Sequence, residues 1–170
     1  MPEENPYRIT QVCVVVNDLD ATVKAYTDIL GWGPWAIYDY VPPRLHHGRL
    51  HGQDQDFTMV GAECEIQPGL WFEIIQPLDG PSIYREHLEK HGEGLHHIAM
   101  MKPTVEESDA LRSHFEDRGS KVSMGARFGE TDADTIEFYY LDVPPLKLVV
   151  ESGYDLGQEL RFDRRYPPAE

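Results

Sequence analysis

Apolar and polar positions along this chain follow one order of elements, and that order occurs twice. The first half begins with the β-branched run 8–16, after which apolar residues recur at the three- and four-residue spacing of a helix face. Strands are predicted again at 35–40, 57–66 and 70–75, where glycines and prolines mark the turns. The polar, histidine-rich segment 44–56 is predicted to be a loop.

The second half repeats this order. It contains a predicted strand at 95–101, a helix capped by Thr104, and strands around 121–124, 135–141 and 146–151. Each half therefore reads strand, helix, strand, strand, strand, which favours an α+β fold built from two βαβββ modules. Because an α+β domain of this size can show such an order by chance, the order alone does not decide the fold.

The same pattern divides the chain into four parts. We predict a first module at 8–78, a connector at 79–94, a second module at 95–153 and a C-terminal arm at 154–170. The connector contains a short helical stretch that is closed by glycines. The arm is charged and ends in Pro-Pro-Ala-Glu, and we expect either a surface arm or a frayed tail.

The composition narrows the class of protein. With 30 acidic and 15 basic residues, the 170-residue chain has a formal net charge of −15. Such a surface repels phosphate backbones and anionic lipids, which argues against nucleic-acid and membrane partners. Cys13 and Cys64 lie in apolar runs and are expected to be buried thiols. Since the N-terminus lacks a signal-peptide pattern and no apolar run reaches the ~20 residues of a membrane span, we expect a cytoplasmic protein.

Four polar residues interrupt otherwise apolar strands: Gln11, Glu73, His97 and Glu151. Gln11 and His97 lie in the first strand of their halves, and the two glutamates lie in the last. If a pseudo-two-fold axis relates the halves, the four side chains converge on it. Because buried carboxylates are costly unless they are paired or bind a metal, the pattern predicts one divalent ion, such as Zn, Ni, Co, Mn or Mg. The alternative is that hydrogen bonds satisfy each residue separately.

Four stretches of sequence carry a resemblance to a known family: ITQVCVVVNDLDATVKAYTDILGW, WFEIIQPL, GEGLHHIAMM and FYYLDVPPLKLVVES. They resemble the vicinal oxygen chelate superfamily, which includes glyoxalase I, methylmalonyl-CoA epimerase, extradiol dioxygenases and the fosfomycin and bleomycin resistance proteins. The resemblance implies paired βαβββ modules that form a partly closed, barrel-like sheet around a metal site, with the metal held by the four residues above. It also implies a homodimer that acts on a small-molecule substrate.

Single positions distinguish the branches of this superfamily. Gln11 stands where an extradiol dioxygenase has a histidine, which argues against iron and oxygen chemistry. Val15 and Pro77 stand where glyoxalase I anchors glutathione, so we do not expect glutathione to be recognised. The phrases FEIIQPLDG and EGLHHIAM are most similar to the methylmalonyl-CoA epimerase branch.

The resemblance and the ligand set together imply a metal-dependent isomerase, epimerase or lyase that moves a proton next to a carbonyl through a metal-stabilised enolate. An acyl-CoA or a 2-oxo or 2-hydroxy compound is the expected substrate. Glu151 is our first choice for the base, and Glu73 for a ligand that also shares in proton transfer. The base of the epimerase branch has no clear counterpart, and the nearest candidates are Asp56, Thr58 and Glu63. Alternatives are a metal-free small-molecule or drug-binding protein of the resistance type and an extradiol-type dioxygenase.

Two further features give weaker expectations. His96 is expected to point to the strand face opposite His97 and to be a packed or hydrogen-bonded neighbour of the site. Arg127 and Phe128 are placed in a glycine-flanked loop, where they can contact an anionic substrate.

Overall fold

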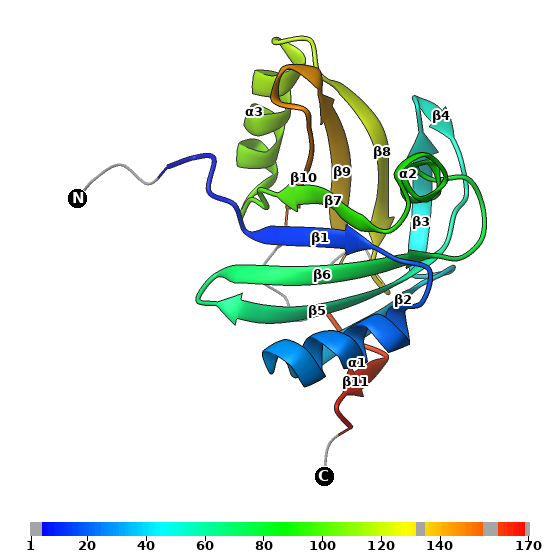
Figure 1. Ribbon diagram of the computed structural model, residues 1–170. Coiled ribbons are helices and arrows are strands. Elements are labelled where there is room, and N and C mark those ends of the chain that lie inside the picture. Colours follow the sequence, from blue (N-terminus) through cyan, green and yellow to red (C-terminus); the bar gives the residue numbers. More distant parts are fainter. Residues whose placement is uncertain (1–4, 132–134, 155–159, 169–170) are drawn as a thin grey trace.

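A computed structural model describes residues 5–131, 135–154 and 160–168 and shows an α+β fold with one strongly curved sheet (Figure 1). The elements that precede the connector helix are β1 (Gln11–Val15), α1 (Leu19–Leu30), β2 (Trp35–Tyr40), β3 (Leu45–Leu50), β4 (Gln53–Asp54), β5 (Met59–Gln67) and β6 (Leu70–Pro77). The remaining elements are α2 (Ile83–His91), β7 (Gly94–Ala99), α3 (Val105–Glu116), β8 (Lys121–Phe128), β9 (Ile136–Val143), a 3-10 turn (Pro144–Leu146), β10 (Leu148–Tyr154) and β11 (Arg164–Tyr166).

The first strands of the two halves lie side by side in the middle of the sheet (Figure 1). The strand order is β11-β2-β5-β6-β1-β7-β10-β9-β8-β3-β4, and β1 and β7 run antiparallel. On one side β6 pairs in parallel with β1, and on the other side β10 pairs in parallel with β7. This arrangement confirms the predicted α+β class and is the one that two strand-helix-strand-strand-strand repeats produce when their first strands pair.

Each half covers the outer face of its strands with one helix. The Asp18 side chain accepts a hydrogen bond from the Ala21 amide at the start of α1, and Gly31 ends the helix in the left-handed conformation, with φ of 71°. Thr104 caps α3 in the same way by accepting from the Glu107 amide. α1 packs on β5 and β6, and α3 packs on β9 and β10. No helix of the described part of the chain is long and apolar enough to cross a membrane.

Strand alternation separates these outer cores from an inner core on the concave face. In β6, Ile74 lies in the core beneath α1, whereas Ile75 lies in the inner core. In β10, Val150 lies in the core beneath α3, whereas Val149 packs against the inner core. Since Glu73 and Glu151 alternate with the outward-facing positions, both carboxylates are directed to the concave side.

The segment 44–56 is not a loop, and our prediction there was wrong. β3 and β4 form a hairpin, and β3 pairs with β8 of the second half, which extends that side of the sheet. The strand has little apolar alternation because it lies near the sheet edge, with buried Leu45 as its main anchor. Its register shifts between His46 and Arg49, and His47 has a φ of 53°, which further obscures the strand pattern.

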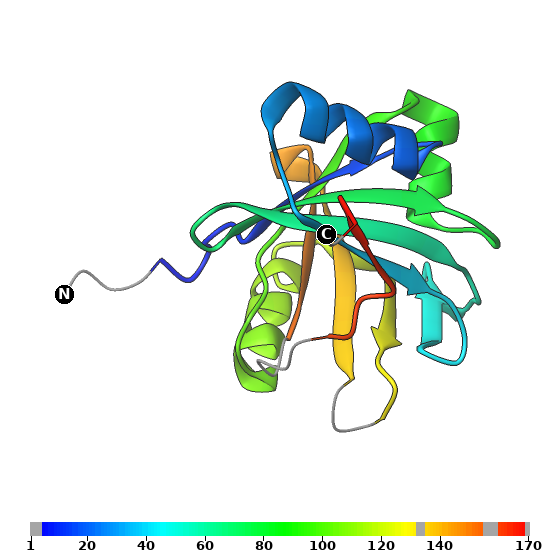
Figure 2. The ribbon, with the colours of Figure 1, turned by 90° about the horizontal axis from the view of Figure 1, so that it is seen from below.

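The C-terminal segment adds a strand to the opposite edge of the sheet. β11 pairs with β2, and in Figure 2 it is the red strand near the C-terminal label. The Asp163 carboxylate accepts hydrogen bonds from the Asp39 amide and from Arg44, both at 2.8 Å. The segment 160–168 therefore extends this edge of the sheet through β11, while residues 155–159 and 169–170 of the predicted arm and residues 1–4 of the N-terminus lie outside the described residues.

Candidate metal centre

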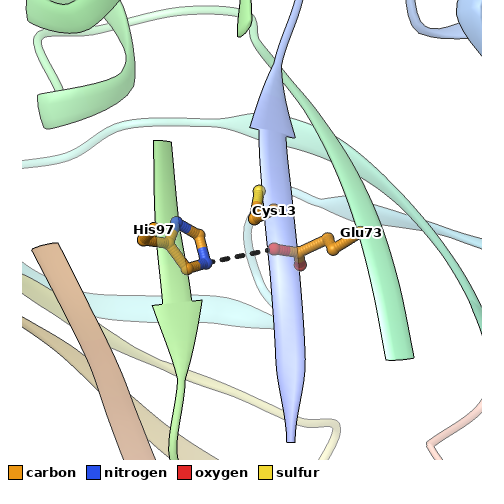
Figure 3. A group of neighbouring side chains, drawn as sticks. All are labelled: Cys13, Glu73 and His97. Carbon is orange, nitrogen blue, oxygen red and sulfur yellow. Dashed lines mark ion pairs between the residues drawn. The ribbon is translucent and has the colours of Figure 1, made fainter. Parts of the chain in front are cut away.

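Three neighbouring strands each contribute one side chain to a row on the concave face, and Cys13 is the middle residue of this row. It is paired with Glu73 of β6 on one side and with His97 of β7 on the other. Figure 3 shows the Glu73 carboxylate and the His97 ring directed toward each other, with Cys13 beside them.

A second row lies two residues away from the first on β1 and β7, and it continues onto β10 instead of β6. Gln11 of β1 is paired with Ala99 of β7, which in turn is paired with Glu151 of β10. A two-fold rotation between β1 and β7 therefore exchanges Gln11 with His97 and Glu73 with Glu151. The register of the sheet thus shows the symmetric placement on which the predicted ligand set depends.

The imidazole of His97 lies between the two carboxylates. Its Nε2 atom is 2.9 Å from Oε2 of Glu151 and 3.5 Å from Oε2 of Glu73 (Figure 3). The three residues are 0%, 7% and 5% exposed. None of these three atoms makes a hydrogen bond of good geometry with any described residue, although buried polar atoms normally do. Two carboxylate oxygens and one imidazole nitrogen that converge without hydrogen bonds fit a divalent cation.

The electrostatics of the cluster point the same way. Burial lowers the pKa of His97, but the adjacent carboxylates of Glu151 and Glu73 outweigh burial and raise it to about 9. Burial raises the pKa of Glu73, and the nearby His97 ring partly opposes this rise. A protonated His97 therefore offsets part of the negative charge of the two carboxylates in the absence of a metal, and a divalent cation can take over that role.

His96 lies on the same side as His97, which corrects our expectation. The pairing of β1 passes from His97 directly to Leu95, so His96 is the extra residue of a bulge. Its Nδ1 atom is 2.8 Å from Nδ1 of His97. Burial, followed by the neighbouring histidines, lowers the pKa of His96 to about 2, so it is a neutral ring. If His97 offers Nε2 to a metal, its Nδ1–H can donate a hydrogen bond to Nδ1 of His96. Such a hydrogen bond from a metal-binding histidine to a neighbouring group holds the orientation of the imidazole ring.

A chain of tyrosine hydroxyls orients Glu151. The Tyr140 hydroxyl donates to Oε1 of Glu151 at 2.9 Å, and the Tyr84 hydroxyl of α2 donates to Tyr140. Both tyrosines are almost completely buried. Because Oε1 is held in this way, Oε2 is left to face His97. The sequence did not indicate this role, since a tyrosine in an apolar strand reads as ordinary core.

A cavity of about 510 Å³ opens onto this cluster. Gln11, Glu73 and Glu151 contribute to its wall, so the structure brings these three predicted residues together, and His97 is buried beside them. Several aromatic rings complete the wall, namely those of Tyr38, Tyr40, Trp71, Phe138 and Tyr140. The cavity therefore combines a polar floor with largely aromatic sides, as small-molecule sites commonly do.

Glu63 brings a third carboxylate to the same cavity. It lies on β5, where it is paired with Glu73, and its Oε1 atom accepts a hydrogen bond from the Tyr40 hydroxyl at 3.5 Å. Of the three sequence candidates for an additional base, Glu63 alone lines this cavity, whereas Asp56 and Thr58 line a separate hollow beside Phe57.

Arg127 and Phe128 are not in a loop, so that expectation was wrong. Both belong to β8, which pairs with β9. Gly125, which the sequence suggested as a loop residue, lies within the same strand and is paired with Tyr139. Arg127 forms an ion pair with Glu137 at 2.9 Å and lines a hollow away from the metal cluster. Phe128 is fully buried in the inner core.

Comparison with known proteins agrees with this architecture. Residues 10–140 match the family described as the Glyoxalase/Bleomycin resistance protein/Dioxygenase superfamily. Because the match spans most of the sequence, the chain belongs to this superfamily. A comparison with curated protein sequences gives no match.

Solved structures of similar fold include methylmalonyl-CoA epimerases. The Mycobacterium tuberculosis epimerase has a TM-score of 0.57 and 19% identity, with 86% of this chain and 87% of that chain covered. A methylmalonyl-CoA epimerase in complex with methylmalonyl-CoA and NH4+ has a TM-score of 0.60 and 21% identity, covering 91% and 99%. A hypothetical protein from Bacillus halodurans has a TM-score of 0.60 and 16% identity, covering 91% and 98%. At these identities the similarity shows a common fold.

Proposed function

We propose that this protein is a metal-dependent isomerase, epimerase or lyase that transfers a proton at the carbon next to a carbonyl group. The observation that carries the proposal is the convergence of Glu73, His97 and Glu151 at one point beside the cavity, with three buried atoms that make no good hydrogen bond. Gln11 lines the same cavity and supplies an amide oxygen from the two-fold-related position.

The residues of the cluster would hold one divalent ion, with Gln11, Glu73, His97 and Glu151 as its protein ligands. A bound ion would supply a Lewis acid that polarises the substrate carbonyl and lowers the cost of removing the neighbouring proton. His96 would keep the His97 ring in the orientation that presents Nε2 to the ion. The aromatic wall would exclude water around the reacting carbon.

Carboxylates on different strands would transfer the proton. Glu151 comes from the second half and is oriented by the Tyr140 hydroxyl, so it is our first choice for the base. Glu73 comes from the first half and can act from the other side of a bound substrate. Glu63, which is not one of the four proposed ligands, lies next to Glu73 and can return the proton on that side. Groups on two sides of one carbon are what an epimerase requires.

Small carbonyl compounds, including acyl-CoA thioesters and 2-oxo or 2-hydroxy acids, are the proposed substrates, and a homodimer is the proposed assembly. The cavity of about 510 Å³ accommodates an acyl group and the adjoining part of a larger carrier. A structure of similar fold is a complex with methylmalonyl-CoA, which supports an acyl-CoA substrate. Val15, which stands at the position of a glutathione anchor, is fully buried, so a glutathione adduct is not proposed.

The proposal is tested by measuring bound metal and hydrogen exchange on the same samples. We expect one divalent ion per chain by elemental analysis, and metal-dependent exchange of the α-hydrogen of methylmalonyl-CoA, propionyl-CoA or 2-oxobutyrate with deuterated water. Glu151→Gln should lower kcat for exchange on the order of 10²–10⁴-fold, because the amide cannot accept the proton.

Three outcomes would each overturn one part of this proposal: the metal-dependent reaction, the substrate class or the role of Glu151. Protein that binds these compounds but holds no metal would indicate a binding protein of the resistance type. Rapid isomerisation of the hemithioacetal of methylglyoxal and glutathione would assign the chain to the glyoxalase I branch. Undiminished exchange by Glu151→Gln with one bound ion would remove Glu151 from proton transfer and leave Glu73 and Glu63.

A further inference from the structure

The thiol of Cys13 is placed within the metal cluster itself. Cys13 is fully buried in the centre of the sheet, between the strands that carry Glu73 and His97 (Figure 3). One potential ligand atom from each of these three residues lies within 4.8 Å of the other two. The unsatisfied Oε2 of Glu73 and Nε2 of His97 are an independent sign that this cluster is built for a cation.

We propose that Cys13 is an additional ligand of the bound ion, as a thiolate, and that the centre therefore favours Zn²⁺ or Co²⁺ over Mg²⁺ or Mn²⁺. This inference rests on the proposed metal centre and specifies which ion it takes. Thiolates are soft ligands that suit zinc and cobalt, whereas magnesium and manganese favour oxygen ligands.

The geometry requires a modest adjustment of the sulfur position. Bonds of ~2.0–2.3 Å allow two ligands of one ion to be separated by ~3.5 Å in a tetrahedral site and by ~4.4 Å when they lie opposite each other. The limit of 4.8 Å for the Cys13, Glu73 and His97 atoms is slightly larger than the second value. The Nε2 atom of His97 and the Oε2 atom of Glu73 already have the tetrahedral separation, at 3.5 Å, and the sulfur would have to approach its neighbours by up to ~1.3 Å.

The thiol is neutral until an ion arrives. In the metal-free protein the Cys13 S–H group donates a hydrogen bond to the Val14 carbonyl oxygen at 3.5 Å. Binding of the ion forms a metal–sulfur bond and breaks the S–H bond, and the proton is released to solvent. No electron transfer is involved.

Thiolate ligation also bears on the role of Glu151. The two-fold equivalent of Cys13 is Ala99, so the sulfur makes the centre asymmetric. With the thiolate and the Glu73 carboxylate, two negative ligands already balance a divalent ion. Glu151 is then not needed to balance the ion's charge, which leaves this carboxylate available to accept the substrate proton.

Cobalt spectroscopy tests the proposal directly. Metal-free protein titrated with Co²⁺ should develop visible d–d bands together with a near-ultraviolet charge-transfer band from thiolate to cobalt. Cys13→Ala, which copies the residue at the two-fold equivalent, should lose the charge-transfer band and bind Zn²⁺ at least about tenfold more weakly relative to Mg²⁺. Cys64→Ala is the matched control, because this buried cysteine lies in the core beneath α1, and it should keep the band.

X-ray absorption of the zinc-loaded wild-type protein makes the test independent of any variant. We expect a sulfur scatterer at ~2.3 Å in addition to nitrogen and oxygen at ~2.0–2.2 Å. Stoichiometric metal with d–d bands, but with neither the charge-transfer band nor the sulfur scatterer, would overturn Cys13 ligation and leave the proposed function intact. Absence of any stoichiometric ion would overturn both.

Discussion

At the scale of single residues, the two carboxylate oxygens of Glu151 contact different neighbours. One oxygen accepts the Tyr140 hydroxyl, and the other faces His97. Tyr140 is itself held by Tyr84, so the carboxylate is oriented by a buried chain of hydroxyls that reaches α2. A carboxylate fixed in this manner would present the same lone pair to each bound substrate, which favours the proposed role in proton transfer over simple charge balance.

This orientation predicts the effect of Tyr140→Phe. Removal of the hydroxyl should lower kcat for hydrogen exchange ~10–100-fold, because the carboxylate loses the contact that fixes it, while about one ion per chain remains bound. Tyr139→Phe is the control, since this hydroxyl on the same strand contacts Ser108 on the other side of the sheet. Equal activities of the two variants in the exchange assay would show that Tyr140 has only a packing role.

The sequence revealed some members of the site and concealed others for physical reasons. Glu73 and Glu151 could be found because a carboxylate in an apolar strand needs a partner. Cys13 was read as a buried thiol, which is correct for its burial, but alternation alone does not separate a core cysteine from a ligand. His96 was assigned to the wrong face because a bulge changes the alternation, and nothing in the sequence marks the bulge.

At the scale of elements, both sheet edges are completed by segments that the repeat does not contain. β3 of the first half pairs with β8 of the second, and β11 from the C-terminus pairs with β2 of the first half. β11 is an edge strand and β3 lies next to the other edge. Both are short and polar and pair with strands that are distant in the sequence, so their local sequences resemble loops. The central strands were predictable because both of their faces are buried and their apolar runs are long.

The docking of β11 can be tested at Asp163. Asp163→Ala should lower the free energy of unfolding by about 1–2 kcal/mol, because the carboxylate accepts hydrogen bonds from Arg44 and from the Asp39 amide and is only partly exposed. Chemical denaturation provides the measurement. Asp142→Ala, which removes an exposed carboxylate of β9, should change stability by less than ~0.5 kcal/mol. If the two variants have the same stability, the arm does not depend on this contact.

At the scale of the whole molecule, the proposed ion would join the two halves. Its ligands come from β1 and β6 of the first half and from β7 and β10 of the second, and the halves also meet through the pairing of β1 with β7 and of β3 with β8. Without an ion, the meeting point contains two buried carboxylates and only one imidazole to offset their charge, which is a weak source of stability. An ion bound there should therefore stabilise the whole fold rather than one module.

Metal-dependent stability follows from this arrangement. An ion present at 100 times its dissociation constant should stabilise the native state by ~2.7 kcal/mol, which corresponds to a rise in Tm of ~5–10 °C for a chain of this length. Thermal unfolding of metal-free protein with and without added Zn²⁺ measures the effect, and a chelator should reverse it. Glu73→Gln should lose most of the rise, whereas Glu89→Gln, at an exposed position of α2, should keep it. If Glu73→Gln shows the full rise, the stabilising ion is bound elsewhere and does not join the two halves.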